Sequence, residues 1–296
     1  MKTSNYQRYL SPGEEFGETE WSTAKQKALE DPEHNYLIEL FGDAVWLELL
    51  QWDTDVLGIL SARINTFFAF RDNWLREDLC QLIIKTHDFL QAKGIKFSSC
   101  RICSDDWVLA DILMENGWVP RDMLNVYISP DISNNEAYCD NTETLDKVEV
   151  IRYINDEEFA GCFSSARLHR DPRIDTSLAT TFYRKLFNNI LSRLDSVLVG
   201  VRLRGQLAGM AIGAEDIALS KMVGRKISYL WQIAVFKEFR GLGLSLKLLN
   251  GFLAHMRDVD VIEIGTQFDH VPANRLYLRA GLHLTANAIT FHKWFD

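Results

Sequence analysis

The segment that most constrains the fold is an apolar stretch that runs into a glycine-containing loop and then into a helix-forming stretch. Residues 227–236, ISYLWQIAVF, are almost wholly apolar and predict a buried strand. Arg-Gly-Leu-Gly-Leu-Ser follows at 240–245, and residues 244–258 have the pattern of a helix. A strand that enters a helix through glycines is typical of α/β sheets, in which the first amides of the helix bind anions.

The loop lacks the features of two common nucleotide-binding motifs. The three-glycine spacing of dinucleotide-binding folds is absent, and no Lys-Ser/Thr pair follows the second glycine, as it would in a P-loop. Two glycines still let the backbone approach a ligand, and the helix dipole favours a pyrophosphate at the first amides of the helix. A tight strand-to-helix turn that needs glycine only for its geometry explains the loop equally well.

Composition divides the chain into four stretches. A length of 296 residues suggests about two domains. Residues 1–34 are polar and acidic and predict a loosely docked N-terminal extension. The other stretches are a smaller α/β domain at 35–130, a linker at 131–147 that is rich in Asn, Asp, Ser and Thr, and a second α/β domain with a mixed sheet at 148–296.

Hydrophobic periodicity predicts alternating strands and helices in both domains. In the first, we expect strands or short helices at 36–42 and 44–50, a turn at 52–55, an alternating segment with Gly58 at 56–70, a helix at 76–93, a strand at 95–104, a helix at 107–116 and a strand at 118–129. In the second, we expect a strand at 148–154, helices at 156–169 and 178–194, a hairpin at 197–215 turning at Arg204–Gly205, and strand 227–236. Helix 244–258, strand 259–268, helix 273–281 and strand 284–295 complete it. The sequence contains no short-period repeat.

The charge balance differs between the two halves of the chain. Residues 1–150 carry 13 Lys and Arg against 27 Asp and Glu, whereas residues 151–296 carry 19 against 14. An acidic first half argues against general nucleic-acid binding, which depends on phosphate neutralisation. No apolar run has the ~18–20 residues of a membrane helix, and the first residues lack the apolar stretch of a secretory signal. We therefore expect a cytoplasmic protein that uses neither nucleic acid nor a membrane.

Two cysteines three residues apart, Cys100 and Cys103, do not predict a metal site. A zinc site needs four ligands, usually from two such pairs, and no second pair is present. On a strand, the two thiols point to opposite faces. We expect buried free cysteines and no metal. The pattern of the helix at 76–93 likewise predicts core packing for Leu79, Ile83, Ile84 and Leu90.

The second domain resembles the GNAT N-acetyltransferase superfamily. Arg240-x-x-Gly243-x-Ser245 is similar to its acetyl-CoA loop, Q/R-x-x-G-x-G/A, with Ser245 where Gly or Ala is usual. One strand later, residues 273–281, ANRLYLRAG, resemble the family segment A-x-x-L-Y-x-x-x-G. The resemblance covers 148–296 in element order, and it implies a GNAT fold that uses acetyl-CoA.

The resemblance also implies roles for individual residues. Tyr277 would be the general acid that protonates the leaving thiolate of coenzyme A. His270 stands where many members have an asparagine that bonds the cofactor, seven residues before the tyrosine, and Asn274 is a nearby substitute. The implied cofactor-binding set is Ile233, Ala234, Val235, Arg240, Gly241, Leu242, Gly243, Leu244, Ser245, His270 and Asn274.

A narrower resemblance is to the branch that acetylates dTDP-fucosamine, an amino-sugar nucleotide. It rests on Trp52–Gly58, on Phe182-Tyr183 with Asn189, and on Thr266-Gln267. It implies that Tyr183, Asn189 and Gln267 bind a small amine acceptor.

Other interpretations stay open. The fold would also suit a non-catalytic acyl-CoA-binding regulatory module, or an enzyme that acetylates a protein or peptide amine. The base is not identified: His169 and Asp171 are candidates, although ordinary surface placement is the simpler expectation, and a water relay serves as well. Trp294-Phe295 would close either a sheet or a homodimer interface.

Overall fold

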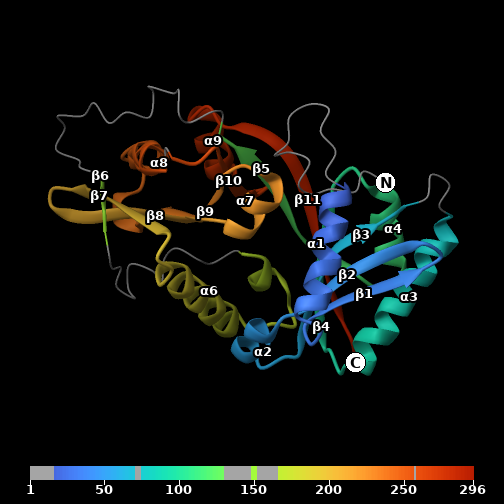
Figure 1. The fold of residues 1–296 in the computed structure, drawn as a ribbon. Coiled ribbons are helices and arrows are strands. Elements are labelled where there is room, and N and C mark those ends of the chain that lie inside the picture. Colours follow the sequence, from blue (N-terminus) through green and yellow to red (C-terminus); the bar gives the residue numbers. More distant parts are fainter. Residues whose placement is uncertain (1–16, 71–74, 130–147, 152–165, 257) are drawn as a thin grey trace. The chain divides into compact units, whose positions relative to one another are not determined.

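The computed structural model describes residues 17–70, 75–129, 148–151, 166–256 and 258–296. The chain forms two compact units (Figure 1), residues 1–124 with 287–296 and residues 125–286. None of the helices in the described ranges combines the length and the apolar content that a membrane-crossing helix needs.

The first unit is a sheet with helices packed on it. Its strands are β1 (Asn35–Leu40), β2 (Asp43–Leu49), β3 (Ser61–Phe68), β4 (Phe97–Cys103) and the end of β11 (His283–Trp294), in the order β1-β2-β3-β4-β11. Only β3 and β4 pair in parallel, and the other pairs are antiparallel. The helices are α1 (Gly17–Glu30), α2 (Gln51–Leu57), α3 (Arg76–Ala92) and α4 (Trp107–Glu115).

The second unit has the same kind of sheet. Its strand order is β5-β10-β9-β8-β7-β6. The strands are β5 (Val119–Ile128), β6 (Val148–Val150), β7 (Ser196–Leu203), β8 (Gln206–Glu215), β9 (Ile227–Val235) and β10 (Val261–Gln267). The helices are α6 (Thr176–Leu191), α7 (Ile217–Val223), α8 (Leu244–His255) and α9 (Val271–Arg279), with 3₁₀ turns η4 (Arg167–Arg170) and η5 (Lys237–Phe239). β5 begins in the first unit and ends in the second, and β11 does the reverse.

The two units repeat one series of elements. The series α1-β1-β2-α2-β3-α3-β4-α4-β5 is matched by α6-β7-β8-α7-β9-α8-β10-α9-β11. The hairpin turns have a non-glycine residue at positive φ followed by glycine, Phe41 (54°) in one unit and Arg204 (51°) in the other. The seven-residue helices α2 and α7 both end at a left-handed glycine, Gly58 (φ 66°, ψ 20°) and Gly224 (φ 67°, ψ 19°).

Hydrogen bonds repeat with the elements. The Leu60 carbonyl accepts from two successive amides, 96 and 97, before β4, and the Lys226 carbonyl accepts from amides 260 and 261 before β10. Trp118 N–H donates to the Leu113 carbonyl at the end of α4, as Leu282 N–H does to the Tyr277 carbonyl at the end of α9. The chain therefore contains two structural copies of one unit, related by an offset too long for a short-period search to find.

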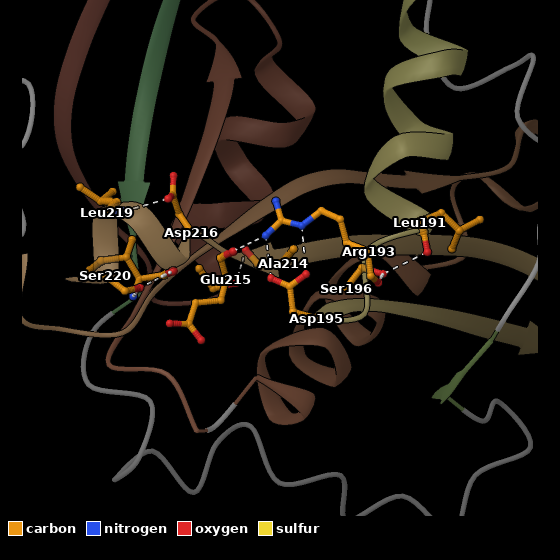
Figure 2. Close-up of polar contacts among 11 residues, drawn as sticks. Leu191, Arg193, Asp195, Ser196, Ala214, Glu215, Asp216, Leu219 and Ser220 are labelled. Atoms are coloured by element: carbon orange, nitrogen blue, oxygen red, sulfur yellow. Dashed lines mark hydrogen bonds and ion pairs between the residues drawn. The ribbon is translucent and has the colours of Figure 1, made fainter. Parts of the chain in front are cut away.

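Local polar contacts set the turns of the second unit. Figure 2 shows the Arg193 guanidinium between two partners: it donates to the Asp195 carboxylate at 2.6 and 3.0 Å and to the Glu215 carbonyl at 2.6 Å. The same view shows Asp216 accepting from Leu219 N–H at 2.9 Å, which caps α7. These contacts join the turn between α6 and β7 to the end of β8.

Most predicted elements are confirmed within two or three residues, but several expectations are wrong. Residues 17–30 form helix α1, whose buried Glu20 accepts a 2.6 Å hydrogen bond from Thr66, so this part of the extension is not loosely docked. The expected turn at 52–55 lies within α2, and Gly58 ends that helix. Helix α7 was not predicted. Ile84 is 42% exposed, and Leu82 is buried instead. The predicted linker and most of helix 156–169 lie outside the described residues.

The predicted domain boundaries differ from the two compact units. Residues 125–129 pack with the second unit and 287–296 with the first, because the two halves exchange their last strands. Phe295 is 4% exposed and packs in the core of the first unit, where β11 pairs with β4. Of the two roles open for Trp294-Phe295, the structure therefore shows sheet closure, while a homodimer stays a prediction.

Candidate active site

The loop between β9 and α8 has the backbone that its glycines predict. Gly241 (φ 82°) and Gly243 (φ 78°) are both in the left-handed region, where L side chains are strained, and a Cβ at either would meet no atom within 4 Å. Arg240 Nε donates to the Val235 carbonyl at 3.1 Å and so closes the loop against the end of β9. Backbone conformation, rather than close packing, therefore requires glycine at both positions.

The first turn of α8 has the character of an anion site. Gly243 is its N-cap residue and supplies no side-chain hydrogen bond, and the first turn holds no acidic residue. Within the described residues, the first amides of the helix therefore have no intrahelical or capping acceptor, and the helix dipole adds positive potential there. Residues 240–243 are exposed, so an anion can reach these amides.

Beside this loop, β9 has an open edge. Its parallel pairing with β10 covers Ile227–Leu230 only, whereas its pairing with β8 continues to Val235 after a bulge at Trp231. Phe236 N–H donates to the Ala208 carbonyl, and successive residues of a strand direct their backbone N–H and C=O groups to opposite sides. The backbone groups of Ala234 therefore point toward β8, and those of Ile233 and Val235 point toward the open edge. In the described part of the chain, Ile233 and Val235 thus have the placement expected for contacts with an extended ligand, and Ala234 does not.

Tyr277 lies on α9 inside the core of the second unit. It is 4% exposed, and its ring packs against Tyr127 of β5 at a centroid distance of 5.3 Å. Burial, with a smaller contribution from Tyr127, raises the pKa of the Tyr277 phenol above its usual value. The phenol therefore stays protonated throughout the physiological pH range, as a proton donor must.

Asn274 holds the loop that links β10 to α9. Its Nδ2 donates to the carbonyls of Gln267 (3.0 Å), Phe268 (3.2 Å) and His270 (3.0 Å). Its Oδ1 accepts from Asn125 Nδ2 at 2.7 Å and from Tyr127 Oη at 2.8 Å. The amide is thus engaged on both sides within the protein, while the exposed His270 is the N-cap residue of α9.

A second group of polar residues lies where η4 meets α6. The rings of His169 and Tyr183 stack at 5.5 Å, and His169 Nε2 lies 3.2 Å from Thr180 Oγ1. Partial burial lowers the pKa of His169, which keeps the imidazole neutral at pH 7. An Arg170–Asp269 ion pair of 2.9 Å joins this group to the loop that carries Gln267 and His270.

The structure brings together some predicted acceptor-binding residues and not others. Tyr183 and Gln267 belong to segments joined by the ion pair, but Asn189 is exposed near the C-terminal end of α6 and lies ~240° around the helix from Tyr183. Asp171 is 1% exposed, so the expectation of ordinary surface placement is wrong for it. No periodicity marks an irregular segment such as η4, and the sequence therefore did not predict the contacts of His169 with Tyr183 and Thr180.

Cys100 and Cys103 form no disulfide. Cys100 is buried, as expected, and burial raises the pKa of its thiol, whereas Cys103 is only half-buried. Among the described residues, no group of three or more His, Cys, Asp or Glu side chains is placed to hold a metal ion.

Comparison with known proteins finds a family match in the second half of the chain. Residues 154–282 match the model of the acetyltransferase (GNAT) family. A search of curated proteins found no significant match.

Several solved structures share the fold. A GCN5-related N-acetyltransferase from Sphaerobacter thermophilus aligns with a TM-score of 0.54 at 15% identity, covering 91% of this chain and 85% of that one. A tandem GNAT protein from the clavulanic acid biosynthesis pathway aligns with a TM-score of 0.55 at 15% identity, covering 92% of this chain and 87% of that one. A GCN5-related N-acetyltransferase from Kribbella flavida aligns with a TM-score of 0.53 at 12% identity, covering 94% of this chain and 96% of that one. At these identities the likeness concerns the fold alone.

Proposed function

We propose that the protein transfers acetyl from acetyl-CoA to the primary amine of a small acceptor, an amino-sugar nucleotide, because residues 154–282 match the model of the acetyltransferase (GNAT) family. The observation that carries the proposal is the uncapped start of α8, with Gly243 as its N-cap residue, beside the open edge of β9. The amides at 241–245 suit the pyrophosphate, and the backbone groups of Ile233 and Val235 suit the amide-containing arm of the cosubstrate.

The proposed chemistry is direct transfer. The neutral amine attacks the acetyl carbonyl, the tetrahedral intermediate collapses with cleavage of the C–S bond, and the coenzyme A thiolate leaves. Tyr277 donates its phenolic proton to that thiolate. The neutral His169 is our candidate to accept the ammonium proton, directly or through water, because its lowered pKa leaves it unprotonated at pH 7.

The acceptor is proposed from the sequence resemblance to enzymes of dTDP-fucosamine, with Gln267 and Tyr183 on its side of the site. Consistent with this acceptor, we propose that the enzyme acts in the cytoplasm. A basic peptide amine is the second acceptor class to be screened.

The test combines a binding and a turnover measurement on Tyr277→Phe. We expect the wild type to bind acetyl-CoA in calorimetric titration and to acetylate at least one member of a panel of amino-sugar nucleotides. The variant should bind acetyl-CoA as the wild type does, because its ring still packs against Tyr127, while turnover falls ~10²–10⁴-fold.

Tyr36→Phe is the matched control, because it removes a phenol that donates to the Glu33 carbonyl in the first unit. Its turnover should equal that of the wild type. Near-normal turnover of Tyr277→Phe would exclude Tyr277 as the acid. Binding of acetyl-CoA without turnover on amino-sugar nucleotides or on peptide amines would favour a regulatory acyl-CoA-binding module.

A further inference from the structure

The polar network around Asn274 depends on a strand from the first half of the sequence. Asn125 and Tyr127 are two residues apart on β5 and therefore face the same side of the sheet. Both donate to the single Oδ1 atom of Asn274, at 2.7 and 2.8 Å. Tyr127 is 1% exposed and belongs to the core of the second unit, whereas Asn125 and Asn274 are half-buried beside it.

The first unit contains the same arrangement with different chemistry. The two units can be aligned on the glycines that follow α4 and α9, Gly117 and Gly281, which have φ of 77° and 80°. By position relative to these glycines, Tyr277 corresponds to Leu113 and Asn274 to Ala110. On the strands that follow, Asn125 and Tyr127 correspond to Ile289 and Phe291.

All four equivalents in the first unit are apolar core residues. Ala110, Leu113, Ile289 and Phe291 are each at most 7% exposed and belong to one hydrophobic cluster. The same backbone is thus built twice, once around an apolar core and once around two half-buried amides and two buried tyrosines. Since buried polar groups are unfavourable unless they are hydrogen-bonded, the fold itself gives no reason for them in the second copy.

We propose that Asn125 and Tyr127 are positioning residues for acyl transfer, acting through Asn274 on the 267–270 loop and on Tyr277. This inference rests on the proposed function. Asn274 ties three carbonyls of the loop to α9, and the two β5 donors hold its amide in the orientation that makes those bonds. The Tyr127 ring, at the same time, supports the ring of Tyr277.

The network acts on the acceptor side of the site. The loop carries Gln267, and its Asp269 pairs with Arg170 beside His169. The acetyl-CoA groups proposed above lie instead on β9 and at the start of α8. Loss of the network is therefore expected to change the KM for the amine and kcat, and to leave acetyl-CoA affinity unchanged.

The test compares Tyr127→Phe with Phe291→Leu, a change at the equivalent position of the apolar copy. Tyr127→Phe keeps the ring and removes only the hydroxyl that donates to Asn274. We expect kcat/KM for the amine to fall about tenfold or more, with acetyl-CoA affinity within twofold of the wild type and faster amide exchange in residues 267–274. Phe291→Leu should lower the melting temperature and leave kcat/KM per folded molecule unchanged.

A double-mutant cycle with Asn274→Ala separates positioning from general destabilisation. If Tyr127 acts through Asn274, the two effects on kcat/KM are not additive, and Tyr127→Phe has little further effect once Asn274 is gone. Unchanged kcat/KM in Tyr127→Phe alongside active wild type overturns the positioning role alone. A wild type with no turnover overturns the proposed function as well, so the two failures are distinguishable.

Discussion

His87 is a titratable residue that the fold keeps neutral. The Trp118 indole N–H donates to His87 Nε2 at 2.8 Å, and an indole nitrogen only donates, so His87 must offer a lone pair there. Burial, and then the positive charge of Lys293, lower the pKa of His87 from 6.5 to about 4. Protonating this imidazole would break the bond to Trp118 and place two cations together.

The lowered pKa predicts a stability change with pH. The unfolded chain takes up a proton on His87 near pH 6.5, whereas the folded chain does so only near pH 4. The contribution of His87 to stability is therefore complete above pH 6.5 and is lost as pH falls toward 4, by roughly 1–2 kcal/mol after allowance for solvent screening. Urea unfolding between pH 7.5 and 4.5 measures it.

His87→Gln is the control for this prediction. Its amide carbonyl can accept from Trp118 without titrating, so its loss of stability over the same pH range should be smaller than that of the wild type. If the free energy of unfolding falls equally with pH in the wild type and in His87→Gln, the pH effect does not come from His87.

At the scale of elements, the starts of α3 and α8 differ in charge. Helix α3 has Glu77 and Asp78 in its first turn, whereas the first turn of α8 has no acidic residue and begins at Gly243. The acidic residues of α3 interact with its dipole and would repel a pyrophosphate. The loop before α3, residues 69–75, also contains no glycine. We therefore propose that acetyl-CoA binds in the second copy.

Giving α8 an acidic start should weaken acetyl-CoA binding without harming the fold. Ser245 takes the second helical position, which Glu77 holds in α3. Ser245→Asp should lower acetyl-CoA affinity at least tenfold in calorimetry, and less at high salt, while the melting temperature stays equal or rises. Ser245→Ala, small and neutral, should bind as the wild type does. Unaltered binding by Ser245→Asp would place the pyrophosphate elsewhere.

Sequence patterns predicted the elements that periodicity and glycine define. Helix α3 with its stop at Gly94, the Arg204–Gly205 turn and the β9–α8 loop all have strong local signals. Short helices such as α2 and α7 have only two turns, which is too few for periodicity to distinguish them from turns. Their shared left-handed glycine cap was the available signal.

The site was predictable where a motif is local and not where contacts are distant. The loop glycines and Tyr277 lie in short segments that resemble family motifs. Asn125 and Tyr127 contact Asn274 across about 150 residues of sequence, and no local sequence pattern around them predicts the contact. The burial of Asp171 likewise depends on tertiary packing.

At the scale of the whole molecule, each unit is completed by the other half of the sequence. The first unit takes residues 287–296, including the core residues Phe291 and Phe295, and the second takes residues 125–128 with Tyr127. Compositional boundaries could not show this, because they locate connecting segments and not strand partners. The exchange makes the folding of each unit depend on the whole chain.

The exchange predicts how the two halves behave when they are separated within the 131–147 stretch. Fragment 1–138 lacks Phe291 and Phe295, and removing two buried phenylalanines costs on the order of 6–10 kcal/mol, comparable to the whole stability of a domain. We expect neither fragment to unfold cooperatively alone, as followed by circular dichroism. Co-expressed 1–138 and 139–296 should instead elute as a 1:1 complex with one cooperative transition, because each supplies the strand that the other lacks. A fragment that melts alone near the temperature of the intact chain would show that the exchanged strands are dispensable.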